Sequence, residues 1–218
     1  MEGEPTSRAV ALGLRVHSGW AVLVALAGRG TEPLIVDRRR IELVESRTRD
    51  QLQPYHAASE LDLKEAETFL KRRLAISQTI AVRVLAAEID HLARDGYHVA
   101  GCGLLLSSGR PGSDLRVTLQ SHALIHAAEG HFFREALLHA CRHHRVPVTS
   151  VRERDLFATA AEQFHRTPDE LICKVAALGR SLGPPWTQDH KGAALIAWLT
   201  LARHDSAREG ARAAGRIE

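Results

Sequence analysis

The chain has 218 residues, of which 44% are hydrophobic and 25% are charged, which is typical of one globular domain with a sizeable core. It contains no apolar run of about 18 residues, which excludes a membrane-spanning helix, and its polar start does not resemble a signal peptide. The formal net charge of +3 is too small for a protein that coats nucleic acid, although basic residues cluster at 38–40, 71–73 and 142–145. We therefore expect a soluble, cytoplasmic protein.

The cysteines exclude two kinds of small stabilised fold. There are three of them, Cys102, Cys141 and Cys173, and they are widely spaced. An odd number without a CxxC pair argues against a disulfide framework and against a structural zinc site. Because each cysteine lies in an apolar run, we expect all three to be buried thiols.

The first part of the chain has the pattern of an antiparallel meander. Residues 1–7 are polar and are expected to form a disordered lead. Short apolar runs rich in β-forming residues follow, separated by small and polar turn residues at 17–19 and 28–30. Strands are predicted at 8–16, 19–27 and 33–44. Residues 46–61 are polar, contain Pro54 and are predicted to form a loop.

The rest of the chain alternates between helical and strand patterns. Apolar residues recur at spacings of three and four from 62 to 94, which predicts a long helix. A continuous apolar run then predicts a strand that is buried on both faces. This strand is expected at 97–107, followed by a loop at 108–113, a helix at 121–144, a strand at 146–151, and helical segments at 154–165, 168–182 and 189–203. We expect a single domain over 8–203 and a flexible tail over 204–218.

Two stretches of sequence resemble a known family. Residues Ala11–Val22 read ALGLRVHSGWAV, which is a strand, a small-residue turn and a second strand. Residues Asp189–Leu199 read DHKGAALIAWL, which is an alanine-rich helix opened by an acidic residue. Both resemble the Holliday-junction resolvase branch of the ribonuclease H-like superfamily. The resemblance implies an α/β fold with a five-stranded mixed sheet, three antiparallel strands first, helices on both faces, and DNA or RNA as a partner.

The resemblance also implies a catalytic site, which this sequence matches poorly. In that branch three or four carboxylates hold two divalent ions, which position a water and stabilise the leaving oxygen of a phosphodiester. The matching residues on the first strand are Leu14, Arg15 and Val16, and the fourth strand ends at Ser107. Only Asp189 carries a carboxylate at an implied position. We therefore expect a diverged site that lacks most catalytic acids.

A second set of residues has the spacing of a metal site. His122, His126 and Glu129 are separated by four and three residues, so they share one helical face. If the first turn, at His17, and the start of the last helix, at Asp189, gather at the same end of the sheet, all five residues would lie in one cleft. We then expect His122, His126 and Asp189 as ligands for Mg, Mn or Zn, with Glu129 and Asp189 as catalytic groups. The alternative is that both histidines are ordinary surface or core residues.

Basic residues near the same end of the sheet are candidate nucleic-acid contacts. They are Arg15, His17, Lys191, and Arg110 in the loop at 108–113. Three functions stay open from the sequence. The chain is a nucleic-acid-associated protein with a degenerate metal-nuclease site, a metal-dependent phosphoester hydrolase with a rebuilt His/Glu/Asp site, or a scaffolding protein that forms homo-oligomers through helix 62–94.

Overall fold

The computed structural model describes residues 8–29, 32–107, 109, 112 and 114–214. The lead predicted at 1–7 and the candidate contact Arg110 lie outside the described residues. A five-stranded sheet has the order β3-β2-β1-β4-β5. Its strands are β1 (Arg8–His17), β2 (Trp20–Arg29), β3 (Glu32–Glu42), β4 (Tyr97–Leu106) and β5 (Val148–Arg152). The first three strands are antiparallel, and β4 and β5 run parallel to β1, so the predicted mixed sheet is confirmed.

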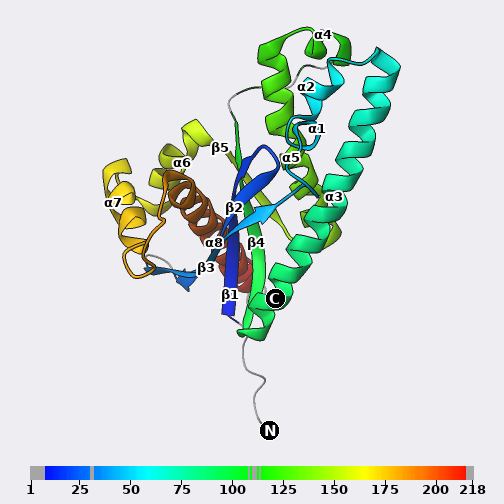
Figure 1. Cartoon of the computed structure of the whole chain (residues 1–218). Helices are drawn as coiled ribbons and strands as arrows, with labels where there is room; N and C mark the ends of the chain where they lie inside the picture. Colours follow the sequence, from blue (N-terminus) through cyan, green and yellow to red (C-terminus); the bar gives the residue numbers. More distant parts are fainter. Residues whose placement is uncertain (1–7, 30–31, 108, 110–111, 113, 215–218) are drawn as a thin grey trace.

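Helices cover both faces of this sheet, as Figure 1 shows. On one face lie α3 (Leu63–Arg94) and α5 (His122–His143), and on the other lie α6 (Leu156–Phe164), α7 (Pro168–Leu178) and α8 (Gln188–Ala214). The two cores follow the alternation of β1, because Leu12 and Leu14 pack with the α5 residues while Ala11 packs with α8. Thus β1 is buried on both sides, which explains its continuous apolar run.

Glycines in β1 and β4 let α8 approach the sheet unusually closely. A Cβ atom added at Gly13 would lie 1.8 Å from the carbonyl oxygen of Ala193, and one added at Gly103 would lie 2.6 Å from that of Ile196. Only hydrogen fits at such positions. Because α8 begins at Gln188, its first turn is held beside the carboxyl end of β1, which places Asp189 there.

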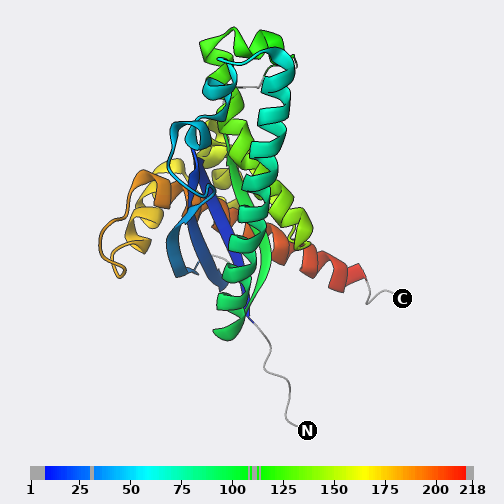
Figure 2. The ribbon, with the colours of Figure 1, turned by 45° about the vertical axis from the view of Figure 1, so that its right-hand side comes forward.

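The predicted loop at 46–61 is partly helical, which corrects the sequence interpretation. It contains α1 (Arg49–Leu52) and α2 (Pro54–Ala58), and another short helix, α4 (Leu115–Leu119), precedes α5. Pro54 occupies the first turn of α2, a position where proline favours a helix. A small apolar cluster that includes Ala58 and Leu70 then holds α2 against α3. Figures 1 and 2 both show α1, α2 and α4 beside the parts of α3 and α5 that extend past the carboxyl end of the sheet.

Other boundaries also differ from the prediction. The last helix continues to Ala214 instead of ending at 203, since its alanine and arginine residues favour helix and no proline interrupts them. The expected burial holds for Cys102 and Cys141, but Cys173 is exposed because it lies on the outer side of α7. Thr167 forms the predicted N-cap of α7, within a capping box with Glu170. None of the described helices combines the length and the apolar composition that a membrane span requires.

Candidate functional site

The carboxyl end of β1 carries a cluster of charged side chains, which we call the edge network: Arg15, His17, Arg134, Glu153 and Asp189. His17 Nε2 lies 3.0 Å from Asp189 Oδ2. Arg15 Nε lies 3.6 Å from Asp189 Oδ1, and Arg15 Nη2 lies 2.7 Å from Glu153 Oε1. Asp189 belongs to the first turn of α8, where a carboxylate is also favoured by the helix dipole. Both oxygens of Asp189 are therefore engaged by cationic or hydrogen-bonding partners.

Glu153 reaches this site from η1 (Glu153–Asp155), the short 3-10 helix that directly follows β5. Arg15 thus lies between two carboxylates that come from different elements. The exposure of the two partners differs, since the Arg15 side chain is 21% exposed and that of Glu153 is 45% exposed. An ion pair with so exposed a carboxylate is weak, because water screens it. Glu153 is therefore the more weakly held part of this ion pair.

Arg134 brings a second guanidinium group to the network from α5. This side chain is buried, and its Nε donates to the carbonyl oxygen of Leu105 at 2.9 Å. Its Nη1 donates to Ser107 Oγ at 3.2 Å and to the carbonyl oxygen of Gly130. Burial lowers the pKa of Arg134, and the like charge of Arg15 lowers it further. The end of β4 is thus occupied by a fixed cationic group close to Arg15.

Aromatic contacts hold His17 in place. Its ring stacks on Trp20, with ring centroids 4.2 Å apart and an interplanar angle of 12°. The Arg40 guanidinium lies 3.9 Å from the centroid of the Trp20 ring, a cation–π contact. These contacts join β1, β2 and β3 at one end of the sheet. They leave the imidazole of His17 directed at Asp189.

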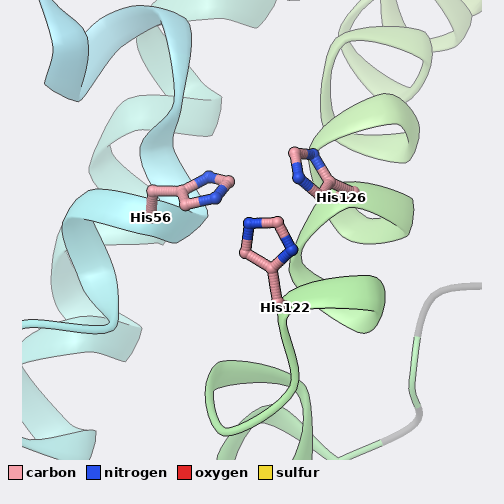
Figure 3. Close-up of side chains that lie close together, drawn as sticks. All are labelled: His56, His122 and His126. Carbon is pink, nitrogen blue, oxygen red and sulfur yellow. The ribbon is translucent and has the colours of Figure 1, made fainter.

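A second cluster, which we call the histidine group, consists of His56, His122 and His126. One ring nitrogen of each lies within 4.8 Å of one from each of the others. Figure 3 shows His56 reaching from α2 toward His122 and His126 on α5, with the three rings turned toward one another. Ring centroids are 4.4 Å apart for His122 and His126, 5.0 Å for His56 and His126, and 5.5 Å for His56 and His122. His56 is half-buried, and the other two are exposed.

A buried carboxylate supports the histidine group. Glu129, one turn after His126 on α5, is only 3% exposed. Its Oε1 accepts a hydrogen bond from the His56 backbone nitrogen at 3.2 Å and lies 2.9 Å from His56 Nδ1. Burial raises the pKa of the neighbouring Tyr55 hydroxyl, and the charge of Glu129 raises it further. Glu129 therefore fixes α2 on α5 and orients the ring of His56.

The structure sorts the predicted residues into two groups. The expected approach of His17 to Asp189 is present, and so is the expected proximity of His122 to His126. However, the partners of Asp189 are His17 and Arg15, and the third histidine beside His122 and His126 is His56. The ligand set suggested by the sequence is thus divided between the edge network and the histidine group. Lys191 lies half-buried in the first turns of α8, two residues after Asp189.

The sequence interpretation missed three residues of these groups. His56 was placed in a loop, and its partner Glu129 lies 73 positions away in the chain. Arg134 resembles an ordinary surface arginine of a helix, and Glu153 lies in a polar segment after a strand. For His56 the available signal was Pro54, which predicts the start of a helix and would have placed His56 on it.

Comparisons with known proteins agree with this architecture. No protein-family model matches the chain, and no curated protein matches it in sequence. The chain is similar to the structure of Thermus thermophilus RuvC, with a TM-score of 0.51 and 16% identity over 92% of this chain and 96% of that one. The same protein in complex with a Holliday junction substrate gives a TM-score of 0.51 and 15% identity over 93% and 96%. The yeast mitochondrial Holliday junction resolvase Ydc2 gives 0.42 and 14% over 92% and 80%.

Identities this low establish the fold alone. The chain has a ribonuclease H-like α/β fold with a five-stranded mixed sheet, as the resemblance of its first hairpin and last helix implied.

Proposed function

We propose that this protein binds nucleic acid at the carboxyl end of its sheet and does not perform the two-metal cleavage that the resemblance implies. The observation that carries the proposal is the position of Arg15, which lies on β1 in ion pairs with Asp189 and Glu153. A guanidinium group at this place favours an anionic ligand such as phosphate. The fold adds support, because a protein similar in structure is RuvC bound to a Holliday junction substrate.

The donor set of the edge network does not fit a pair of Mg²⁺ or Mn²⁺ ions. Such ions need several carboxylate oxygens that are free to coordinate them. Here Asp189 is already bonded to Arg15 and His17, and the end of β4 is filled by Arg134 bonded to Ser107. Two guanidinium groups close together repel a divalent cation. The same groups attract a phosphate.

Arg15 can exchange its exposed partner for a nucleic-acid phosphate. The ion pair with Glu153 is screened by water on the Glu153 side, whereas two parallel bonds from guanidinium to phosphate are charge-assisted and geometrically matched. Asp189 would stay in place beneath Arg15 and hold its side chain in one orientation. His17 lies at the carboxyl end of β1, and Lys191 lies near the start of α8. Both supply further contacts to the sugar-phosphate backbone of the nucleic acid.

Binding and cleavage measured separately test this proposal. Fluorescence anisotropy should compare a four-way junction, a duplex and a single strand of DNA, and an RNA duplex, in EDTA at several salt concentrations. We expect binding without divalent ions, with log K falling linearly as log salt rises, at a slope of about −0.9 per phosphate contacted on duplex DNA. Addition of Mg²⁺ or Mn²⁺ should produce no strand cleavage. Absence of binding to all four at low salt, or cleavage that depends on Mg²⁺ or Mn²⁺, would contradict the proposal.

The histidine group favours a second candidate, a metal-dependent phosphoester hydrolase. In that case a histidine-bound ion would activate water, and cleavage would need zinc and disappear on His122→Ala. The burial of Glu129 and its bonds to His56 weigh against its use as the catalytic base. For the scaffolding alternative, the exposed large hydrophobic side chains of the described residues all lie outside α3. They are Leu34, Leu61, Val117, Val148 and Ile172.

A further inference from the structure

Three imidazoles from two separate helices converge on one point beside a buried carboxylate. We propose that His56, His122 and His126 bind one divalent transition-metal ion of the zinc class, and that Glu129 is the positioning residue of this site. The inference is independent of the proposed nucleic-acid function, because none of these four residues belongs to the edge network.

The spacing of the ring nitrogens suits such an ion. Tetrahedral zinc with bonds of about 2.0–2.1 Å to imidazole nitrogen separates its ligand atoms by about 3.3 Å. The nitrogens of the histidine group lie within 4.8 Å of one another, so side-chain rotations that close the distances by at most about 1.5 Å complete the site. His122 and His126 are exposed, and their rotation meets little packing. Imidazole is a preferred ligand of zinc, copper and nickel, in contrast to magnesium and calcium.

Glu129 supplies the carboxylate that metal-binding histidines usually contact with the ring nitrogen that does not bind the metal. A histidine that ligates through one ring nitrogen commonly donates its other ring N–H to a carboxylate, which fixes the tautomer and the ring orientation. His56 Nδ1 lies 2.9 Å from Glu129 Oε1, so Nε2 is the nitrogen left for the metal. Since Glu129 is 3% exposed, little water competes for its oxygens, and its contact holds the imidazole ring of His56 in one orientation.

The origin of the three histidines sets the site apart from an ordinary pair on a helix. His122 and His126 at i and i+4 could bind a metal weakly on any surface helix, but His56 comes from α2 and is held there by two contacts to Glu129. A bound ion would therefore connect α2 to α5. Three protein ligands leave one tetrahedral position for water.

Cobalt(II) provides the probe, because tetrahedral cobalt gives strong visible absorption bands and reports ligand geometry without any enzymatic assay. The whole 218-residue chain should be titrated with Co²⁺, followed by displacement with Zn²⁺ and a measurement of the stoichiometry. We expect one ion per chain. His56→Ala removes a ligand and should weaken metal binding by about 100-fold or more. Glu129→Gln should weaken it by about 10–100-fold, the usual range for a residue that contacts a ligand without touching the metal. The matched control is His131→Ala, which removes an exposed histidine of the same helix and should leave affinity unchanged.

Several outcomes would overturn the inference. If His56→Ala binds as tightly as the wild type, the metal is held by the helix pair alone and the three-histidine site is wrong. Wild-type affinity in Glu129→Gln would remove the role given to Glu129. X-ray absorption at the zinc edge of the unmodified protein decides the case if a variant fails to fold, since three imidazole ligands are expected and two or fewer contradict the site.

Discussion

The close approach of α8 to β1 makes Gly13→Ala a sensitive test of how the fold builds the edge network. The added Cβ atom would lie 1.8 Å from the carbonyl oxygen of Ala193, whereas ordinary contacts begin at 3.4 Å. The helix must therefore retreat by about 1.6 Å locally, because the obstacle is backbone and no side-chain rotation relieves it. A displacement of this size also opens contacts along the interface between α8 and the sheet.

We expect the free energy of unfolding to fall by about 3 kcal/mol, the upper part of the range for overpacked cores. For a chain of this length, that corresponds to a decrease of about 6–12 °C in the midpoint of thermal unfolding. Circular dichroism during heating measures this decrease. The imidazole NMR signals of His17 should shift as well, because Asp189 moves with the first turn of α8 and lengthens its 3.0 Å contact.

A glycine-to-alanine substitution within α8 itself is the control. Gly210 has no atom within 4 Å of an added Cβ, so Gly210→Ala should keep the free energy of unfolding or raise it by up to about 1 kcal/mol through helix propensity. Its midpoint should therefore not fall. One contradicting result is a midpoint for Gly13→Ala within about 2 °C of the wild type; the other is an equal fall of the midpoint in both variants. Either result would show that the close packing of α8 on β1 does not stabilise the fold as described.

Three further substitutions test other parts of the account. Burial raises the pKa of Glu88, so this carboxyl group holds its proton more tightly in the folded state than in the unfolded state. The contribution of Glu88 to stability should therefore decline as pH rises above its ordinary pKa of 4.5. Urea unfolding should show that Glu88→Gln stabilises the protein more at pH 8 than at pH 5, whereas an equal effect at both pH values would contradict this. Arg38→Ala removes bonds to the carbonyl oxygens of Leu182 and Pro184 and should cost about 1 kcal/mol in urea unfolding. Thr167→Ala breaks the capping box of α7 and should lower the free energy of unfolding by about 1 kcal/mol. Thr167→Ser keeps the capping hydroxyl and should retain the wild-type value.

Much of the fold follows from patterns that are local in the chain. The alternation and turn residues of the first 44 residues are enough to indicate the three antiparallel strands, and the long apolar run indicates β4. The contact between His17 and Asp189 was also predictable, because the order of strands and helices brings the carboxyl end of β1 and the start of α8 to the same end of the sheet. These features depend on the spacing of apolar residues and on the order of strands and helices along the chain, and both can be read from the sequence.

The remaining parts depend on packing between distant segments. The helix α2 is too short to show a period, and it is stabilised by contacts with α3 and by Glu129 on α5. Pro54 could have placed His56 on a helix, but nothing local in the sequence brings that helix to His122 and His126. Arg134 reads as a surface residue, yet burial and three acceptors make it part of the edge network. A charged residue inside an apolar helical face is the pattern that would have marked it.

The salt-dependent affinity for duplex DNA in EDTA tests nucleic-acid binding at the edge network most directly. It should be measured for the wild type, for two variants of the edge network and for one control variant. Arg15→Ala should weaken binding and reduce the magnitude of the salt slope by about 1, since one phosphate contact is lost. Glu153→Gln should tighten binding, because it frees Arg15 from its exposed partner. Arg94→Ala, at the opposite end of the sheet before β4 begins, should change neither value. Equal affinities and slopes for the wild type, Arg15→Ala and Glu153→Gln would show that nucleic acid does not bind at this edge.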